Sequence, residues 1–385
     1  MSSFRVAFTG GGTGGHVYPA LAIDDAIRAQ YDAAFYEPRF FGNRDGVEAR
    51  VVTSMPLTFV PSAPLQRRLS LQMLRTVWRN LLGIAVALRA LAAFRPLMVI
   101  ATGGYVCFPV VVAARILRLL RVVRCGIALL EINVRPGLTN RLLAPLVDEV
   151  WTTYDASEGF FGNKAVTTGT PVRASLTAGV HPHRARMELG LAPERTTVVA
   201  MGGSQGARSI NEAVAAMVTR RTLGDDRQVL HLCGERDHAY MAAEERDVGS
   251  NHVLLLAYLA DPANAYAAAD LMIARAGAST LAELAATGTP AVLVPYPHAA
   301  DDHQTSNAEL FVSRGAAVLI ADKELDGDRL WWTVDGLLRS DRLNAMRKAA
   351  RALATPDAGA EIVRRIELLI PARVVDSNAA NEAQS

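Results

Sequence analysis

Hydrophobic residues along this chain gather in short runs, and longer stretches with polar residues on one side lie between them. The runs are rich in Val, Ile, Leu and Phe and have the length of strands, whereas the stretches at 20–30, 210–218 and 280–286 have helical spacing. Strands that alternate with helices predict parallel sheets covered by helices on both faces. We expect strands at 5–9, 34–41, 97–101, 126–130, 150–153 and 165–168 in the first half, and at 197–201, 228–233, 253–257, 271–274, 291–295 and 317–320 in the second.

Both halves of the chain open on the same local pattern. The first expected strand leads into Gly10-Gly11-Gly12-Thr13-Gly14-Gly15-His16, and the strand at 197–201 leads into Gly202-Gly203-Ser204-Gln205-Gly206-Ala207. A helical pattern follows each of these turns. Since a strand, a glycine-rich turn and a helix open a doubly wound nucleotide-binding domain, the sequence predicts an α/β protein with two Rossmann-like domains.

We place the boundary between the two domains near Gly169-Thr170-Pro171, where turn residues separate the two patterns. The first domain is expected to cover residues 1–168 and the second residues 169–355. Ligands of parallel sheets bind outside the carboxyl ends of the strands, so we expect the site in a central cleft that both domains face. The tail at 373–385 is polar and is expected to be disordered.

Charge and cysteine content exclude several classes of protein. The 40 basic and 38 acidic residues nearly cancel, to a net charge of +2, which argues against general nucleic-acid binding. Cys107, Cys125 and Cys233 are scattered without metal or disulfide spacing, as is typical of a reducing compartment. We find no signal-peptide order at the start, and the uncharged stretches 96–114 and 284–300 are interrupted by glycine and proline, so neither predicts a transmembrane helix.

The glycine-rich turn after the first strand is the first candidate for chemistry. Its glycines let the backbone approach a ligand closely, and the following helix presents N–H groups and a partial positive charge to an anion. It has neither a Walker A lysine nor clean dinucleotide spacing. His16 follows the turn at the carboxyl end of a strand, where an imidazole can act as a general base. A simple tight turn and a histidine that caps local backbone are the alternatives.

Two further segments follow expected strands of the first domain. Thr102-Gly103-Gly104-Tyr105 is a second glycine turn facing the same cleft edge. Leu130-Glu131-Ile132-Asn133 places a carboxylate and an amide after a buried strand, and Asn140 lies shortly beyond. These groups can hold sugar hydroxyls or a catalytic side chain. A plain loop, a capping asparagine and a turn asparagine are the alternatives.

The second domain carries its own polar segments. Ser204 and Gln205 lie in a turn at a helix start, where backbone and hydroxyl donors suit a diphosphate. Arg275-Ala276-Gly277-Ala278-Ser279-Thr280 leads into a helix whose Glu283 can accept both ribose hydroxyls, unless it is an ordinary solvated helix charge. Gln304 and Asn307 share a helix face and can read the hydroxyls of a neutral sugar.

Two acidic clusters resemble metal sites but favour other roles. Asp326-Gly327-Asp328 precedes an apolar helix, so helix capping is the favoured interpretation. Asp301-Asp302-His303 are adjacent residues, which seldom point at one centre. We therefore predict no metal ligands.

Residues 66–82 predict a basic amphipathic helix. A stripe of apolar residues is flanked by Arg68, Arg75 and Arg79, with Gln72, Thr76 and Asn80 opposite. A core helix carries the same apolar side, whereas an aromatic anchor with flanking arginines is typical of a helix that lies on an anionic bilayer. The apolar stripe consists of Leu71, Leu74, Trp78, Leu81 and Leu82, and the predicted membrane-facing residues are Leu71, Leu74, Arg75, Trp78 and Arg79.

Taken together, these segments resemble the MurG family, the enzymes that complete lipid II in peptidoglycan synthesis. Eight strings match in family order over about residues 8–310. They are Gly11-Gly12-Thr13-Gly14-Gly15-His16-Val17-Tyr18-Pro19-Ala20-Leu21-Ala22, Gly103-Gly104-Tyr105, Glu131-x-Asn133, Pro136-Gly137-Leu138-Thr139-Asn140, Gly169-Thr170-Pro171-Val172-Arg173, Gly202-Gly203-Ser204-Gln205-Gly206-Ala207-Arg208, Arg275-Ala276-Gly277-Ala278 with Glu283, and Pro295-Tyr296-Pro297-His298 with His303-Gln304 and Asn307.

The resemblance implies a GT-B fold, in which a last helix, here residues 356–372, packs back on the first domain. It implies an inverting transfer of N-acetylglucosamine from UDP-N-acetylglucosamine to the 4-hydroxyl of undecaprenyl-diphosphate-N-acetylmuramyl-pentapeptide. No cofactor is required, although a divalent ion could assist. The implied location is peripheral, on the anionic cytoplasmic face of the bacterial inner membrane, where cell-wall synthesis and division proteins are candidate partners.

The resemblance also assigns roles to single positions. Gly103, Gly104, Tyr105 and Asn140 are placed on the acceptor side. The donor-binding positions are Thr13, Gly14, Gly15 and Asn133 in the first domain, and Arg173, Ser204, Gln205, Leu259, Ala278, Ser279, Thr280, Leu281, Ala282, Glu283, Gln304 and Asn307 in the second.

The sequence departs from the family at one place that bears on catalysis. The family's His-Glu-Gln-Asn is Leu130-Glu131-Ile132-Asn133 here, so two polar side chains are replaced by apolar ones. His16 is therefore the first candidate for the catalytic base and Glu131 the second. A glycosyltransferase with another lipid acceptor, a UDP-sugar-binding protein without catalysis and a UDP-N-acetylglucosamine epimerase are the alternatives.

Overall fold

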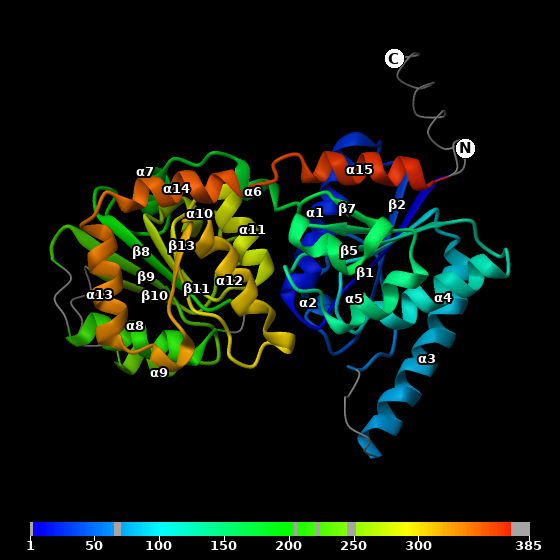
Figure 1. Cartoon of the computed structure of the whole chain (residues 1–385), viewed down its shortest axis with the longest axis horizontal. Coiled ribbons are helices and arrows are strands. Elements are labelled where there is room, and N and C mark those ends of the chain that lie inside the picture. Colours follow the sequence, from blue (N-terminus) through cyan, green and yellow to red (C-terminus); the bar gives the residue numbers. More distant parts are fainter. Residues whose placement is uncertain (1–2, 65–70, 204–205, 221–223, 245–251, 371–385) are drawn as a thin grey trace, which may run out of the picture. The chain divides into compact units, whose positions relative to one another are not determined.

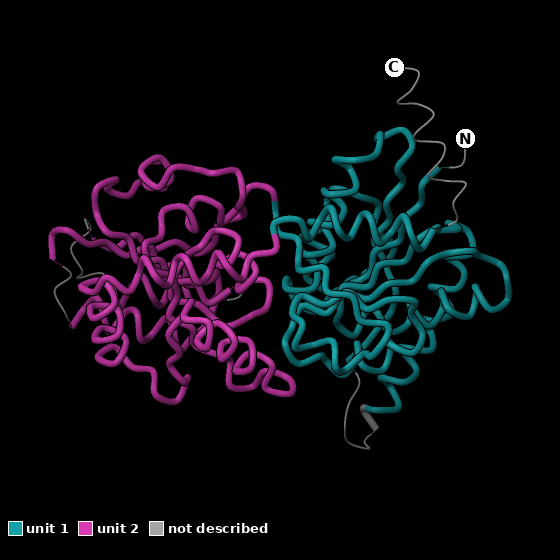
Figure 2. The backbone as a smooth tube through the Cα atoms, turned by 45° about the horizontal axis from the view of Figure 1, so that its top comes forward, with its two compact units in different colours: residues 1–173, 356–385 teal, residues 174–355 magenta. Residues whose placement is uncertain are grey.

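The computed structural model describes residues 3–64, 71–203, 206–220, 224–244 and 252–370. It divides into two compact units, one made of residues 1–173 and 356–385 and the other of residues 174–355 (Figure 2). The boundary that we place at 168/169 from the sequence falls shortly before the division at 173/174. The tail expected to be disordered, 373–385, lies outside the described residues.

The first unit is built on a seven-stranded sheet in which every strand pairs in parallel (Figure 1). The spatial order is β3-β2-β1-β4-β5-β6-β7, so the direction of winding reverses between β1 and β4. In an open parallel sheet this reversal is where ligands bind. The strands are β1 (Phe4–Thr9), β2 (Tyr36–Gly42), β3 (Leu57–Phe59), β4 (Met98–Ala101), β5 (Gly126–Glu131), β6 (Glu149–Thr152) and β7 (Ala165–Thr167).

Helices cover this sheet, and the hydrophobic core of the unit lies between the sheet and the helices. An apolar cluster lies between the sheet and the helices α3 (Leu71–Phe94) and α4 (Cys107–Leu119), which bury residues such as Leu91 and Val110. The other described helices are α1 (Gly14–Gln30), α2 (Glu48–Val51), α5 (Leu138–Leu143) and α15 (Ala358–Leu369), with short 3-10 turns η1 (Ala144–Leu146), η2 (Asp155–Phe160) and η3 (Gly162–Lys164).

Helix α3 is longer than the sequence pattern predicts. The expected end at Leu82 is wrong, because the helix continues through Gly83 to Phe94. Gly83 serves close packing, since a Cβ there would lie 2.0 Å from the Pro61 carbonyl oxygen and 3.1 Å from Pro109 Cβ. The second half of α3 packs on α4, and its first half extends away from the rest of the unit (Figure 1).

Helix α15 closes the first unit, although it follows the second unit in the chain. It lies along α1, where Tyr31 and Gln30 donate hydrogen bonds to Glu367 at 2.7 and 3.1 Å. Arg365 forms an ion pair with Glu149 at the start of β6. The helix therefore packs on α1 and on strands of the first sheet, within the unit that the family resemblance implies.

The second unit repeats the design with a six-stranded parallel sheet of order β10-β9-β8-β11-β12-β13. Its reversal lies between β8 and β11. The strands are β8 (Thr196–Met201), β9 (Arg227–Leu232), β10 (Val253–Leu256), β11 (Leu271–Ala274), β12 (Ala291–Leu293) and β13 (Ala317–Leu319). Two doubly wound parallel α/β units confirm the fold class predicted from the alternating pattern.

The helices of the second unit follow the expected alternation. Asp326 caps one of them by accepting a hydrogen bond from the Arg329 N–H at 2.7 Å, which confirms the interpretation of Asp326-Gly327-Asp328 as a cap. The helices are α6 (Ala174–Thr177), α7 (Pro182–Glu188), α8 (Arg208–Arg220), α9 (His238–Glu244), α10 (Ala263–Ala268), α11 (Ala278–Thr287), α12 (His303–Ser313), α13 (Gly327–Leu338) and α14 (Arg342–Ala352), with η4 (Ala300–Asp302) and η5 (Asp322–Glu324).

Candidate functional site

The turn between β1 and α1 lies at the reversal point of the first sheet. Gly12 has φ of +86°, which favours glycine, and the helix starts at Gly14. The N-cap residue Thr13 makes no side-chain capping bond, and the first turn of α1 contains no acidic residue. The positive end of the helix dipole is therefore not countered by a carboxylate within its own first turn, and the turn favours an anionic ligand.

The ring of His16 is held against this turn. Its Nδ1 lies 3.0 Å from the Gly11 carbonyl oxygen and 3.4 Å from Thr13 Oγ1. A proton on Nδ1 can be donated to the carbonyl, and in that tautomer Nε2 has the lone pair that accepts a proton. The backbone is held as well, because Thr102 Oγ1 donates to the His16 carbonyl at 2.6 Å.

The second glycine turn, after β4, makes room for that ring. Gly103 and Gly104 have φ of +104° and +85°. A Cβ on Gly103 would lie 2.8 Å from His16 Cδ2, and one on Gly104 would lie 2.1 Å from the Gly11 carbonyl oxygen. Tyr105 covers Gly12 from the same side, since a Cβ on Gly12 would lie 2.9 Å from its ring. The structure thus brings the predicted residues Gly103, Gly104 and Tyr105 against the β1–α1 turn.

Glu131, the second candidate for the base, is a buried acceptor of four hydrogen bonds. Its Oε1 accepts from the backbone N–H and the side-chain amide of Asn133, each at 2.9 Å. Its Oε2 accepts from Asn140 Nδ2 at 2.8 Å and from the Gly137 N–H at 3.2 Å. Burial raises the pKa of Glu131, and the four hydrogen bonds oppose that rise. In this conformation the carboxylate orders the loop after β5.

The two apolar replacements beside Glu131 are buried. Leu130 and Ile132 pack in the interior, where the polar pair of the family would need hydrogen-bond partners. Their burial means that neither side chain is available to touch a ligand in this conformation. Glu131 and Asn133 keep their mutual contact without them.

The corresponding turn of the second sheet is described only in part. Ser204 and Gln205 lie outside the described residues. The flanking Gly203 and Gly206 have φ of +94° and +74°, and a Cβ on Gly206 would lie 2.2 Å from the Cys233 carbonyl oxygen. Helix α8 begins two residues after Gly206, so this turn also precedes a helix N-terminus.

The β11–α11 turn lies beside it, at the reversal point of the second sheet. Gly277 precedes α11 and offers no side-chain cap, and Ala278 to Thr280 are small residues in the first helical turn. Glu283 is buried and accepts a 2.7 Å hydrogen bond from the Tyr266 hydroxyl. The alternative that it is a solvated helix charge is therefore wrong.

Arg275 links the loops around this turn through an ion pair and hydrogen bonds. Its guanidinium forms an ion pair with Asp322 and donates to Ser209 Oγ at 2.9 Å. It also donates to the carbonyl oxygens of Val294 and Pro295 at 3.1 and 3.2 Å. These partners follow β12 and β13 or open α8, so one side chain links four elements of the site edge.

Helix α12 supplies two predicted residues with different positions. Gln304 Oε1 accepts the Tyr296 N–H at 2.9 Å at the start of the loop after β12. Asn307 is fully buried and donates to the Ala276 carbonyl at 3.3 Å, beneath the β11–α11 turn. We predicted that both side chains face a sugar. In this structure Asn307 instead supports the turn from inside.

Two predicted donor residues lie farther from these turns along the chain. The guanidinium of Arg173 stacks on the ring of Tyr18 of α1, 4.6 Å from its centroid. Leu259 is half-buried in the loop after β10. Neither the stacking of Arg173 nor the position of Leu259 by itself indicates a ligand.

In the first half of α3, the polar face rather than the apolar face packs on the protein. Thr76 and Asn80 are buried. The side-chain amide of Asn80 accepts a hydrogen bond from the Ala63 N–H and donates one to the Ala63 carbonyl. Leu74 and Trp78 are 67% and 70% exposed. A core helix would show the reverse, so the exposed stripe favours the membrane-facing interpretation; the side chain of Leu71 lies outside the described residues. Among the described helices, Met73–Phe94 is long and apolar enough to cross a bilayer by length and composition alone.

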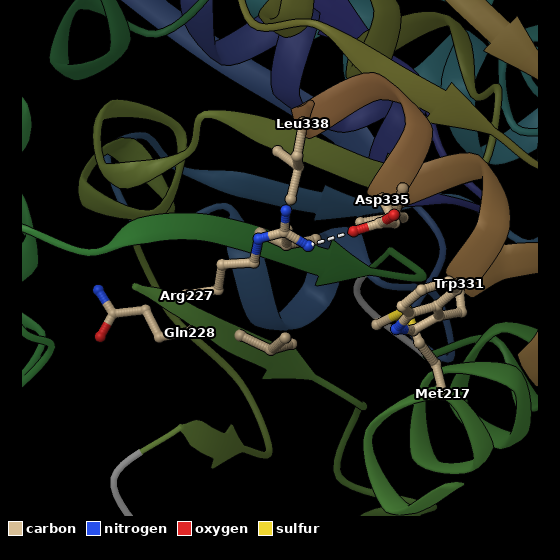
Figure 3. Close-up of a pocket in the computed structure, with 9 residues that line it drawn as sticks. Met217, Arg227, Gln228, Trp331, Asp335 and Leu338 are labelled. Carbon is tan, nitrogen blue, oxygen red and sulfur yellow. Dashed lines mark hydrogen bonds and ion pairs between the residues drawn. The ribbon is translucent and has the colours of Figure 1, made fainter. Parts of the chain in front are cut away.

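A small depression in the second unit lies away from these turns. It is lined by residues such as Arg227, Gln228, Trp331 and Asp335, with an ion pair between Arg227 and Asp335 (Figure 3). Arg227 and Gln228 open β9, so the depression is at the amino ends of the strands. Ligands of parallel sheets bind at the opposite ends.

Sequence reasoning did not single out Glu48. This carboxylate is fully buried and accepts the N–H groups of Asn43 and Gly12. The available signal was its place two residues after Gly46 and shortly after the second strand. No group of three His, Cys, Asp or Glu side chains in the described ranges is arranged to hold a metal ion.

Comparison with known proteins agrees with this architecture. Residues 6–152 match the model of the glycosyltransferase family 28 N-terminal domain, and residues 197–362 match that of its C-terminal domain. A UDP-N-acetylglucosamine--N-acetylmuramyl-(pentapeptide) pyrophosphoryl-undecaprenol N-acetylglucosamine transferase from Desulforamulus reducens is 35% identical, covering 95% of this chain and 99% of the relative.

Solved structures show the same likeness. MurG from Acinetobacter baumannii superposes with a TM-score of 0.71 at 26% identity, covering 95% of this chain and 99% of that one. A UDP-GlcNAc 2-epimerase from Neisseria meningitidis, solved with UDP-GlcNAc bound, reaches a TM-score of 0.63 at 12% identity, covering 94% of this chain and 99% of that one. The second likeness shows a shared fold alone.

Proposed function

Because this chain belongs to the MurG family of glycosyltransferases, we propose that it transfers N-acetylglucosamine from UDP-N-acetylglucosamine to undecaprenyl-diphosphate-linked N-acetylmuramyl-pentapeptide. The family models cover both units, and the relative matches nearly the whole chain. The glycine-rich turns lie at the reversal points of both sheets, where such a donor and acceptor would bind. The product is lipid II.

His16 is the base in this proposal. The acceptor's 4-hydroxyl attacks the anomeric carbon, its proton passes to His16 Nε2, and the bond to the diphosphate breaks with its electron pair on UDP. The configuration at the anomeric carbon inverts. The observation that carries the assignment is the ring position, with Nδ1 on the Gly11 carbonyl and the ring edge against Gly103. A positioned base contributes about 10²- to 10⁴-fold in rate.

Glu131 has a different role in this mechanism. All four of its hydrogen bonds come from the loop and helix after β5, so it orients Asn133 and Asn140 rather than taking a proton from the acceptor. Of these two amides, that of the half-buried Asn133 is the group that we expect to meet sugar hydroxyls, whereas Asn140 is buried in this structure.

Charge on the diphosphates is met by helix N-termini in the proposed mechanism. The starts of α1, α8 and α11 each follow a glycine-containing turn. Such N-termini stabilise developing negative charge without a metal ion, so we propose that no metal cofactor is required. The second unit would hold the uridine and ribose, with Glu283 on the ribose hydroxyls and Tyr266 fixing its orientation.

Attachment to an anionic membrane surface would occur through α3 in this proposal. The exposed stripe Leu74, Val77, Trp78, Leu81 and Leu82 is long enough to sit among lipid headgroups, and Arg75 and Arg79 flank it. This surface would place the unit that carries His16 next to a lipid-linked acceptor. The location that it supports is the cytoplasmic face of the bacterial inner membrane.

A turnover assay tests the proposed function. Wild-type protein, UDP-N-acetylglucosamine and a lipid I analogue should release UDP and form the disaccharide, whereas His16→Ala should lose most of this activity. Conversion of UDP-N-acetylglucosamine to its C2 epimer without any acceptor would favour an epimerase, and preference for a different lipid in competition would favour another acceptor. Tight donor binding with no turnover in either protein would identify a binding protein and refute the proposal.

A further inference from the structure

Glu48 lies directly against the glycine-rich turn that carries the proposed chemistry. It is the first residue of α2, shortly after β2, and β2 pairs with β1. Its side chain is fully buried. A buried carboxylate is costly unless hydrogen bonds compensate it, so its position calls for a reason.

The carboxylate is held by backbone groups of two loops. Oε1 accepts the Asn43 N–H at 2.8 Å, and Oε2 accepts the Gly12 N–H at 3.4 Å. Asn43 belongs to the same loop as Glu48, whereas Gly12 belongs to the β1–α1 turn. The side chain therefore connects the loop after β2 to the centre of that turn.

Three glycines leave space for this carboxylate. A Cβ on Gly11 would lie 2.5 Å from Glu48 Oε1, one on Gly46 would lie 2.3 Å from either carboxylate oxygen, and one on Gly42 would lie 2.6 Å from Cγ. Real Cβ atoms do not approach other atoms so closely. Both the turn and the loop after β2 thus close around Glu48 only because these positions have no side chain.

The turn that Glu48 contacts also holds the ring of His16. The peptide between Gly11 and Gly12 carries the carbonyl that His16 Nδ1 approaches at 3.0 Å and the N–H that Glu48 accepts. The opposite side of the turn rests on the Gly103 backbone, whose carbonyl accepts the Gly11 N–H at 3.2 Å. A change at Glu48 therefore reaches the imidazole through one peptide group.

We propose that Glu48 is a positioning residue for the transfer reaction: it fixes the peptide between Gly11 and Gly12 and through it the ring of His16. Its carboxylate touches neither substrate in this assignment. The inference rests on the role proposed for His16, because it acts through that side chain. Residues that hold a catalytic group in its productive geometry affect turnover more than they affect binding.

The variant Glu48→Gln tests the inference with little change in volume. Glutamine offers one carbonyl oxygen to two backbone donors, so its NH₂ group must face the N–H of Asn43 or Gly12. We expect kcat at saturating donor and acceptor to fall about 10- to 100-fold, the size of effect that misplacement of a catalytic group produces. The KM for UDP-N-acetylglucosamine should change less than about threefold, within the uniform-binding range.

Asp24→Asn is the matched control. Asp24 is also a fully buried carboxylate of the first unit, and it accepts hydrogen bonds from Tyr36 at the start of β2 and from Arg28 near the end of α1. Neither of these two partners belongs to the β1–α1 turn. Loss of stability in this variant with kcat unchanged would show that a buried carboxylate of this unit can be altered without affecting turnover.

The double variant His16→Ala/Glu48→Gln shows whether Glu48 acts through His16. If it does, the double variant should be no slower than His16→Ala alone, since coupled effects are not additive. If Glu48→Gln does not fold, Glu48→Asp, which keeps the charge but withdraws it from Gly12, takes its place with the same expected loss. A kcat within about twofold of wild type in a folded Glu48 variant, or additive effects in the double variant, would overturn the inference. Wild-type activity in His16→Ala would instead refute the assignment of the base.

Discussion

Single residues at the carboxyl edge of the first sheet are constrained by neighbours far apart in the sequence. His16 sits where it does because Gly103 and Gly104 lack side chains and because Thr102 bonds its carbonyl. The motif Gly-Gly-Tyr after a strand predicted a turn at this edge. Only the structure shows that this turn packs against the imidazole ring of His16.

The first prediction concerns Gly103. Gly103→Ala places a methyl group 2.8 Å from His16 Cδ2 at φ of +104°, so the ring must move. We expect kcat to fall by about 10²-fold, as a displacement of about 1 Å in a catalytic group can cause. Steady-state kinetics with the lipid I analogue measures the effect.

Gly190→Ala is the control for Gly103→Ala. Gly190 also has positive φ, +78°, but a Cβ there would meet no atom within 4 Å. This variant should lose about 1 kcal/mol of stability through backbone strain and keep its kcat. An equal loss of kcat in both variants would contradict the proposed contact.

At the scale of elements, ion pairs join strand ends and helix starts into rigid edges. From the sequence, Arg275 was only the first residue of a segment that leads into a helix, because nothing in a linear pattern shows that its partners Ser209 and Asp322 come from α8 and η5. Strands and helices could be predicted from periodicity. The links between their ends could not, since they depend on the sheet order.

The second prediction separates Arg275 from a similar ion pair on the opposite edge of the same sheet. Arg275→Ala frees the loops after β12 and β13, so the KM for UDP-N-acetylglucosamine should rise about tenfold, which corresponds to roughly 1.4 kcal/mol. Arg227→Ala breaks the pair with Asp335 at the amino ends of the strands and should change thermal stability without changing this KM. A similar KM increase in both variants would mean that general loosening of the sheet, rather than the site edge, causes it.

The third prediction uses the ion pair between Arg118 of α4 and Asp148 before β6. Burial alone would raise the pKa of Asp148, but hydrogen bonds from Arg118 and the Ile127 N–H outweigh it and hold the pKa below its ordinary value. The stabilising contribution is therefore present above the unfolded pKa, about 4, and is lost as pH falls through the lower folded pKa.

Urea denaturation of Asp148→Asn at pH 7 and pH 3 tests this linkage. The variant should have a lower free energy of unfolding than wild type at pH 7, and the difference should shrink at pH 3. Glu324→Gln, an exposed change in η5, should show no such dependence. A difference that is equally large at both pH values would contradict the assignment.

For the whole molecule, the alternation of strands and helices and the two glycine-rich turns were enough to predict two Rossmann-like units. The short strand β3 was not predicted, because Leu57–Phe59 is a three-residue edge strand that is only partly buried and lacks a strand-length apolar run. The apolar stripe of α3 was predicted from its periodicity. Its distinction from a core helix required the burial of Thr76 and Asn80.

The fourth prediction tests the membrane surface. Leu74→Ser/Trp78→Ser removes two exposed apolar side chains, so binding to vesicles that contain anionic lipid should weaken at least tenfold, since burying one such side chain contributes roughly 1.5–3 kcal/mol. Activity with a water-soluble acceptor and thermal stability should stay near wild type.

Trp332→Ser is the control for the membrane variant, because this tryptophan is 61% exposed in the second unit. Its vesicle binding should match that of wild type. Equal vesicle binding of wild type and Leu74→Ser/Trp78→Ser would refute the proposal that α3 binds the membrane.

Helix α15 makes residues 174–355 an insertion within the first unit. On the ribosome, α1 and its sheet emerge long before the helix that covers them, while every strand of the second unit is made before residue 356. We therefore expect the later-made unit to reach its native state first and the earlier one to wait for its closing segment. Nascent chains that end at Thr355 would leave the Tyr31 face of α1 open to chaperones, and their capture would ease once residues 356–370 have emerged.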